Sequence, residues 1–411
     1  MTVAETCALA KKNACAAANL TEEARNRMLT LAAQALCSRA QEIIKANEKD
    51  ISACTRGEQF IDRLRLSDSR IAEIAEGLTQ LRALPCPAGE VLERYQTENG
   101  LDISRVRVPF GVVGIIYEAR PNVTADAIGL CLKSGNAVVL RGSKDAYFSN
   151  AAIVEAMKEA WRQGGFACEF VQLIEDCSRE GAREFMRQKK YLDVLIPRGS
   201  AALIQSALEN STVPVIETGT GNCHIYLESS ALPEKALSIL MNAKTQRTSV
   251  CNAAESLVLD ESFAQKHLAT IVSALQNAGV EVVGDAAAQA ICSAVSPAEE
   301  EDFFTEFLSL KISVKIVRDI GEAIPFINAH STGHSEAIVT ENQEHAERFL
   351  REIDSACVYV NASTRFTDGF EFGFGAEMGI STQKLHARGP MGLRELTSYQ
   401  YRIRGNGQIR K

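Results

Sequence analysis

Cys251 is the residue of this sequence whose surroundings best suit nucleophilic chemistry. It lies in the polar stretch of residues 244–255 (KTQRTSVCNAAE), which also holds Arg247. The thiolate is the nucleophilic form of cysteine, and cationic or amide-donating surroundings lower the pKa of a thiol from about 8.5. Cys131 and Cys357 lie in apolar runs, where we expect inert side chains. Context alone leaves two interpretations of Cys251: a catalytic nucleophile and a buried structural cysteine.

Glu217 is the second candidate for chemistry. It follows the apolar run 213–216 and opens the glycine-rich turn 217–221 (ETGTG), 34 residues before Cys251. A carboxylate in such a turn is either a general base or a cap of the backbone.

Residues 193–200 (DVLIPRGS) predict a strand that leads through a Gly-Ser turn into a helix. The free amide groups at Gly199 and Ser200 would face the positive end of the helix dipole, which is a phosphate-binding arrangement. The simpler alternative is an ordinary helix cap.

Residues 138–144 (VVLRGSK) end another predicted strand with Arg141, Ser143 and Lys144. Ligands of open α/β sheets bind at the carboxyl ends of the strands, so these side chains are candidates for a ligand contact. Lys144 would favour a ligand with additional phosphate charge, whereas the alternative is a solvated basic loop.

The histidines do not form a metal-ligand pattern. His330 and His334 are four residues apart, but the intervening Ser-Thr-Gly argues against a helix, and no third ligand is suitably spaced. We therefore predict no metal site.

Composition excludes several classes of protein. The 411 residues are 46% hydrophobic and 23% charged, which is typical of a soluble protein of two or three domains. Fifty-two acidic against 44 basic residues give a net charge of −8 without a basic stripe, so we expect no nucleic-acid partner. The first 20 residues lack an unbroken apolar run, and no later run reaches the ~20 residues of a membrane span. Together with twelve cysteines and no CxxC motif, this predicts a cytoplasmic protein without a membrane partner.

The hydrophobic pattern predicts the elements that position these residues. The first 80 residues have helical spacing, and short branched-apolar runs then alternate with helical stretches between residues 112 and 216. This alternation predicts a parallel, doubly wound sheet. A second such series runs from 256 to 360, and the alternating segment 101–108 is expected to pair with a C-terminal strand around residues 399–403.

Four long strings carry a resemblance to a known family: residues 108–122 (VPFGVVGIIYEARPN), 215–226 (VIETGTGNCHIY), 249–255 (SVCNAAE) and 379–393 (GISTQKLHARGPMGL). They resemble the aldehyde dehydrogenase superfamily and, more narrowly, its reductases of glutamyl phosphate. The resemblance covers essentially the whole chain. Thr248, where a proline is expected, and Phe370, where a glycine is expected, depart from the pattern without removing a catalytic group.

The resemblance implies an α/β fold of the aldehyde dehydrogenase type, with two doubly wound α/β domains and a small oligomerisation β-hairpin. We expect an NADP-binding domain over 1–230, with 361–385 returning to it, and a catalytic domain over 231–360. Strands in 98–110 and 386–411 would build a homo-oligomer.

The resemblance also implies a mechanism, in which Cys251 attacks the carbonyl of L-glutamyl 5-phosphate and forms a thioester. NADPH then reduces the thioester to L-glutamate 5-semialdehyde, the second step of proline biosynthesis from glutamate. Asn122 matches the amide that holds the oxyanion together with the backbone N–H of Cys251. Glu217 matches the general base of oxidising members, and here we expect it to position the cofactor or a proton.

The cofactor and substrate contacts come from the same resemblance. Arg141, Ser143 and Lys144 match positions at the adenosine ribose, where Lys144 suits the 2′-phosphate of NADPH. Gly199 and Ser200 match the helix start that faces the pyrophosphate. Further contacts are Glu306 to the nicotinamide ribose and, as a hypothesis, Arg247 to the departing phosphate.

Two alternatives stay open at this point. One is a hydrolytic NAD(P)-dependent aldehyde dehydrogenase that uses Glu217 as its base, and the other is a non-catalytic nucleotide-binding protein. Under the leading interpretation, a separate glutamate 5-kinase supplies the acyl phosphate.

Overall fold

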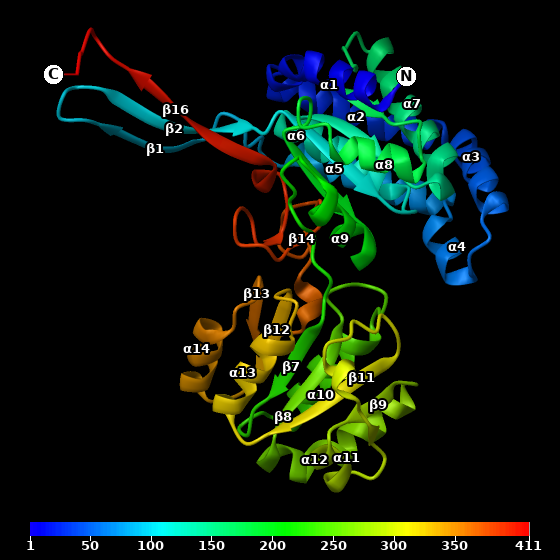
Figure 1. Cartoon of the computed structure of the whole chain (residues 1–411), viewed down its shortest axis with the longest axis vertical. Helices are drawn as coiled ribbons and strands as arrows, with labels where there is room; N and C mark the ends of the chain where they lie inside the picture. The colour runs from blue at the N-terminus through cyan, green and yellow to red at the C-terminus, as the bar shows by residue number, and fades with distance from the viewer. Residues whose placement is uncertain (411) are drawn as a thin grey trace. The chain divides into compact units, whose positions relative to one another are not determined.

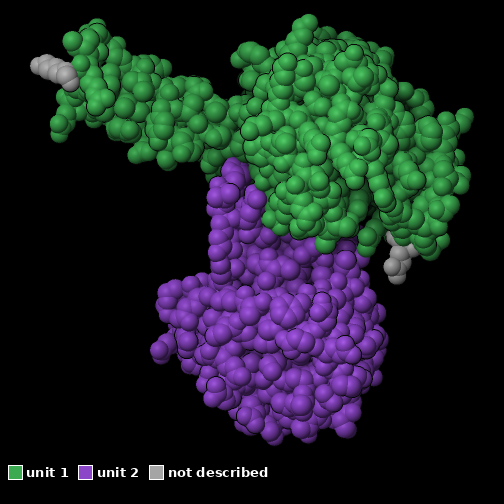
Figure 2. Space-filling view, in the orientation of Figure 1, with its two compact units in different colours: residues 1–218, 373–379, 391–411 green, residues 219–372, 380–390 purple. Residues whose placement is uncertain are grey.

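The chain folds into two compact units. The computed structural model describes residues 1–410, apart from the side chain of Gln59. Unit 1 comprises Met1–Thr218, Gly373–Gly379 and Met391–Lys411, and unit 2 comprises Gly219–Phe372 and Ile380–Pro390 (Figure 2).

The division between the units differs from the predicted one. We expected the first domain to extend to residue 230 and residues 361–385 to return to it. The units instead divide after Thr218, because β7 (Cys223–Leu227) pairs with strands of unit 2 on both of its edges. Residues 361–372 and 380–390 also belong to unit 2, so only the last part of the predicted 386–411 segment lies in unit 1.

Unit 1 begins with five helices, which confirms the helical pattern of the first 80 residues. Side chains of Thr2, Thr21 and Ser67 accept hydrogen bonds from backbone amides in the first turns of α1, α2 and α5. The helices are α1 (Val3–Ala18), α2 (Glu22–Ser38), α3 (Ala40–Ala53), α4 (Glu58–Leu64) and α5 (Asp68–Ala83).

A parallel four-stranded sheet follows in unit 1, in the order β5-β4-β3-β6. Its strands are β3 (Val112–Tyr117), β4 (Ala137–Arg141), β5 (Val171–Leu173) and β6 (Val194–Arg198). The chain adds β4 and β5 on one side of β3 and β6 on the other, so a switch point lies between β3 and β6, where ligands of such sheets bind. The run 213–216, predicted as a strand, makes a single parallel bridge from Val215 to Leu195.

Helices connect these strands, as the predicted doubly wound arrangement requires. They are α6 (Asn122–Ser134), the 3-10 turn η1 (Lys144–Ala146), α7 (Tyr147–Gln163), α8 (Arg179–Met186) and α9 (Ala201–Asn210).

An antiparallel sheet forms an arm of unit 1. It consists of β1 (Val91–Gln96), β2 (Asp102–Pro109) and β16 (Thr397–Arg404), with β2 in the middle (Figure 1). Tyr399 lies opposite Arg107 and Ile403 opposite Ile103, which confirms the predicted pairing of the 101–108 segment with the C-terminal strand.

Unit 2 is built on a parallel seven-stranded sheet in the order β10-β9-β11-β8-β7-β12-β13. Alternate side chains of β8, such as Leu257 and Val258, enter different apolar clusters, so both faces of the sheet are covered. Besides β7, the strands are β8 (Ala254–Asp260), β9 (Glu281–Gly284), β10 (Ser296–Pro297), β11 (Lys311–Val317), β12 (Ser335–Val339) and β13 (Cys357–Val360).

The remaining elements of unit 2 are mostly the connecting helices, whose ribbons lie beside the sheet in Figure 1. They are α10 (Pro233–Thr245), α11 (Glu261–Asn277), α12 (Ala286–Ile291), η2 (Glu300–Phe303), α13 (Ile320–His330), α14 (Gln343–Glu352), η3 (Thr364–Phe366) and the short strands β14 (Ile380–Ser381) and β15 (Gly389–Pro390). The turn η4 (Arg394–Leu396) precedes β16 in unit 1. No helix among the described residues is both long and apolar enough to span a membrane.

Candidate active site

Cys251 lies in the turn between α10 and β8, and its side chain is half-buried. Because the strands of unit 2 are parallel, this turn shares one edge of the sheet with the segments that precede β7 and β11. The carbonyl oxygen of Cys251 accepts a hydrogen bond from the thiol of Cys223, at 3.2 Å. A Cβ atom at Gly221 would lie only 1.5 Å from the same oxygen, so glycine is required where the two backbones meet. The backbone of Cys251 is therefore held from the side of β7.

Lys244 does not serve Cys251 as the sequence suggested. Its ammonium group is bonded to the carboxylate of Glu255, and both side chains are completely buried. Burial lowers the pKa of Lys244 and raises that of Glu255 to about 7. The pair joins the end of α10 to the start of β8, on either side of the Cys251 turn.

Arg365 is a cation near Cys251 that sequence reasoning missed. It donates hydrogen bonds to Gln246 Oε1 at 2.9 Å and to Asn252 Oδ1, within the turn that carries the thiol. Burial and the charge of Arg247 lower the pKa of Arg365, while a thiolate at Cys251 acts in the opposite direction. Since this attraction is mutual, the guanidinium group favours the thiolate form of Cys251. Arg247, which we predicted beside the nucleophile, is exposed in the same turn.

Glu306 lies in the segment between η2 and β11. Its Oε1 accepts the backbone N–H of Gly221 at 2.7 Å, and burial raises the pKa of its carboxyl group. Unit 2 thus brings Glu306 to Gly221, the residue that contacts the backbone of Cys251.

The other predicted site residues belong to unit 1. Asn122 is exposed at the first turn of α6, and its Nδ2 donates to Asp126 Oδ2 at 3.2 Å. Glu217 is half-buried beside Thr218, whose hydroxyl donates to the carbonyl of Pro197 at 2.6 Å. The hydrogen bond of Thr218 holds this segment against the end of β6.

Ser200 caps α9, since its Oγ accepts the N–H of Leu203. The carboxylate of Glu118, which follows β3, accepts hydrogen bonds from the N–H of Ser200 at 3.0 Å and from its hydroxyl at 2.7 Å. A Cβ at Gly199 would meet the same carboxylate. The start of α9 therefore holds an anion, as predicted, but the anion in place is a side chain that sequence reasoning did not single out.

The three residues at the end of β4 have different environments. Arg141 is 9% exposed, and its Nη2 donates to the carbonyls of Cys177 and Ser178. Burial lowers the pKa of Arg141. Ser143 caps η1 through the N–H of Asp145, whereas Lys144 is exposed. Lys144 is thus the cation of this strand end that solvent and ligands reach.

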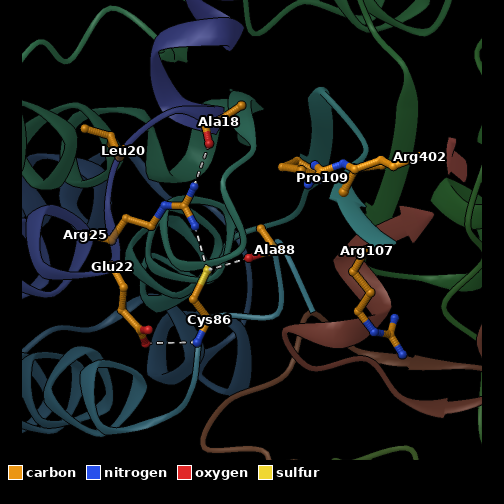
Figure 3. A pocket seen from close by; sticks show the side chains of 11 residues that line it. Ala18, Leu20, Glu22, Arg25, Cys86, Ala88, Arg107, Pro109 and Arg402 are labelled. Atoms are coloured by element: carbon orange, nitrogen blue, oxygen red, sulfur yellow. Dashed lines mark hydrogen bonds between the residues drawn. The ribbon is translucent and has the colours of Figure 1, made fainter. Parts of the chain in front are cut away.

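A cavity of about 270 Å³ in unit 1 contains none of the predicted site residues (Figure 3). On its wall, Arg25 is 3% exposed and donates to the thiol of Cys86 at 2.6 Å and to the carbonyl of Ala18 at 2.9 Å. The N–H of Cys86 in turn donates to Glu22 at 3.0 Å. These bonds fasten α2 to the segment before β1.

The fold and the cysteine turn define a class of protein, and comparison with known proteins agrees with it. The family model described as "Aldehyde dehydrogenase family" matches residues 1–309 and 311–400. The chain belongs to the aldehyde dehydrogenase family.

Particular relatives are more closely similar. A gamma-glutamyl phosphate reductase of Caldanaerobacter subterraneus is 52% identical over 395 residues, which cover 95% of each chain. The protein of the same name from Carboxydothermus hydrogenoformans is 54% identical over 396 residues, 96% of this chain and 95% of that one. The crystal structure of gamma-glutamyl phosphate reductase from Thermotoga maritima is 46% identical, covers 100% of both chains and superposes with a TM-score of 0.97.

Proposed function

We propose that the chain catalyses the NADPH-dependent reduction of L-glutamyl 5-phosphate to L-glutamate 5-semialdehyde and phosphate, the second step of proline biosynthesis from glutamate. The names of relatives more than 50% identical over nearly the whole chain support this substrate. The structural observation that carries the proposal is the turn of Cys251, which is held by Cys223 and Gly221 and carries Arg365 as a partner for a thiolate.

The first chemical step belongs to Cys251. Its thiolate attacks the acyl carbon of the substrate, the bond from that carbon to the phosphate oxygen breaks, and inorganic phosphate leaves. The product is a thioester, which accepts hydride more readily than a free carboxylate does. When bound, the nicotinamide cofactor supplies that hydride. The carbon–sulfur bond then breaks, and the thiol and the aldehyde are restored.

The charge that develops on the acyl oxygen needs hydrogen-bond donors. We assign this role to the backbone N–H of Cys251 and to the side-chain amide of Asn122. Loss of one such donor typically costs about 10²- to 10³-fold in rate. Arg247, exposed in the cysteine turn, is proposed to hold the departing phosphate, because a guanidinium group matches phosphoryl oxygens.

The residues of unit 1 fit a phosphate-bearing cofactor in two places. The start of α9 at Gly199 and Ser200 already binds a carboxylate, which is the chemistry that a pyrophosphate needs. Lys144, exposed after β4 and next to Ser143 and Arg141, suits the 2′-phosphate of NADPH. In unit 2, Glu306 is proposed to hold the nicotinamide ribose. Glu217 is proposed to position the cofactor or a proton.

Partners and location complete the proposal. A separate glutamate 5-kinase would supply the acyl phosphate in the cytoplasm, where the cysteines stay reduced. A homo-oligomer would cover the arm, on whose outer strand Tyr399, Tyr401 and Ile403 are 52%, 51% and 58% exposed. Covering an exposed apolar edge prevents its aggregation.

The test is the phosphate dependence of NADP reduction with glutamate 5-semialdehyde, measured for the native chain and for Cys251→Ala. Turnover that needs phosphate and disappears in the variant supports the proposal. Turnover without phosphate would identify a hydrolytic aldehyde dehydrogenase with Glu217 as its base, and full activity of Cys251→Ala would overturn the role of the cysteine.

A further inference from the structure

Glu255 makes a second contact that the ion pair with Lys244 does not explain. While Oε2 binds the ammonium group of Lys244, Oε1 accepts the backbone N–H of Leu308 at 3.1 Å. Glu255 is on β8 and Leu308 lies 53 residues later, in the segment before β11. One fully buried carboxylate thus ties three segments together.

Leu308 needs such a restraint. Its φ is +52°, in the left-handed region, where a side chain with a Cβ costs about 1–2 kcal/mol. A strained residue keeps its conformation only where surrounding contacts hold it, and the bond to Glu255 is such a contact.

The restrained segment carries Glu306, two residues before Leu308. Negative charge on Glu306 raises the pKa of Glu255, so the two carboxylates repel each other. Glu306 nevertheless stays bonded to Gly221, whose backbone contacts the carbonyl of Cys251. A chain of contacts therefore runs from Glu255 through Leu308 and Glu306 to the backbone of the nucleophile.

We propose that Glu255 is a positioning residue that holds Glu306 in its working place through the backbone amide of Leu308. The inference rests on the proposed function, in which Glu306 binds the nicotinamide ribose. It adds that cofactor affinity depends on a buried carboxylate that does not itself touch the cofactor.

The test compares two variants without the buried charges, because removing one partner alone would leave the other charge buried and unpaired. In Lys244→Met with Glu255→Gln, the amide oxygen at position 255 can still accept the N–H of Leu308. In Lys244→Met with Glu255→Leu, it cannot. We expect the leucine variant to have a KM for NADPH about tenfold above that of the glutamine variant, with kcat changed much less.

Two controls separate positioning from general destabilisation. Asp260→Asn removes another buried carboxylate from the same strand, at the end away from the cysteine turn, and should leave the KM for NADPH unchanged. In a background of Glu306→Ala, the difference between the two double variants should disappear, because the residue through which Glu255 acts is gone.

Equal KM values for NADPH in the two folded double variants would overturn the inference. If either variant fails to fold, hydrogen exchange of the native chain still decides: we expect a strongly protected amide at Leu308, and rapid exchange there would refute the restraint. Failure of the proposed function is distinct, because it would show as turnover in Cys251→Ala whatever the double variants do.

Discussion

The carboxylate of Glu118 binds the first turn of α9 through Ser200, accepting its N–H at 3.0 Å and its hydroxyl at 2.7 Å. Glu118 follows β3 and Ser200 follows β6, so the bond spans the switch point of the unit 1 sheet. The carboxylate occupies the donors proposed for the cofactor pyrophosphate. Cofactor binding at this helix start therefore requires Glu118 to move.

Glu118→Gln should lower the KM for NADPH several-fold, because a neutral amide competes less well than a carboxylate for these donors. Steady-state kinetics at fixed substrate measure it. Glu155→Gln, which changes an exposed glutamate of α7, is the matched control and should have no effect. A raised KM in Glu118→Gln would mean that Glu118 supports the cofactor site rather than competing with it.

Lys144→Ala should raise the KM for NADPH about tenfold and leave the KM for NADH nearly unchanged, because the ammonium group is proposed to meet the 2′-phosphate that only NADPH carries. The measurement is the ratio of kcat/KM for the two cofactors. Lys12→Ala, at an exposed lysine of α1, controls for the loss of one surface charge. An unchanged ratio would remove Lys144 from cofactor selection.

Arg365→Ala should slow the alkylation of Cys251 by iodoacetamide at pH 7 by about tenfold, because the guanidinium group that favours the thiolate is lost. The rate should recover at high pH, where the thiol ionises without help. Arg318→Ala, at a side chain that is 83% exposed, is the control. A rate that stays low at every pH would instead indicate a collapsed turn.

His334 predicts how unit 2 responds to acid. Burial lowers the pKa of His334 to about 4 from 6.5, and its Nε2 lacks a hydrogen-bond partner among the described residues. Below pH 6.5 the unfolded chain binds a proton that the folded chain refuses, so stability falls as the pH drops from 6.5 towards 4. The contribution of this one group is about 3 kcal/mol.

The variant His334→Gln should flatten that part of the curve of unfolding free energy against pH. Urea unfolding at several pH values between 4 and 7.5 measures it, with His267→Gln on α11 as the control. A slope equal to that of the native chain would show that other groups cause the acid sensitivity.

Local patterns in the sequence were sufficient for much of the fold. Helical spacing predicted the five N-terminal helices, and the alternation of short apolar runs with helical stretches predicted parallel sheets in both units. The period-2 pattern of residues 101–108 and of the C-terminal segment predicted the pairing of β2 with β16. These features depend on residues a few positions apart, where side-chain periodicity reports which face is buried.

The polar composition of residues 244–255, read from the sequence, singled out Cys251, and the strand–turn–helix pattern marked Ser200 as an anion site. What they bind was decided by the tertiary structure. Glu118 reaches Ser200 from 82 positions away, and Arg365 reaches Asn252 from 113.

The boundary after Thr218 was likewise set by β7 pairing with β12, more than 100 residues later. Hydrogen bonds between distant segments form only once strands and helices have packed, and they leave no periodic signal in either segment. The sequence by itself therefore determined the elements and the reactive side chain, and only the tertiary structure decided which charged groups meet them.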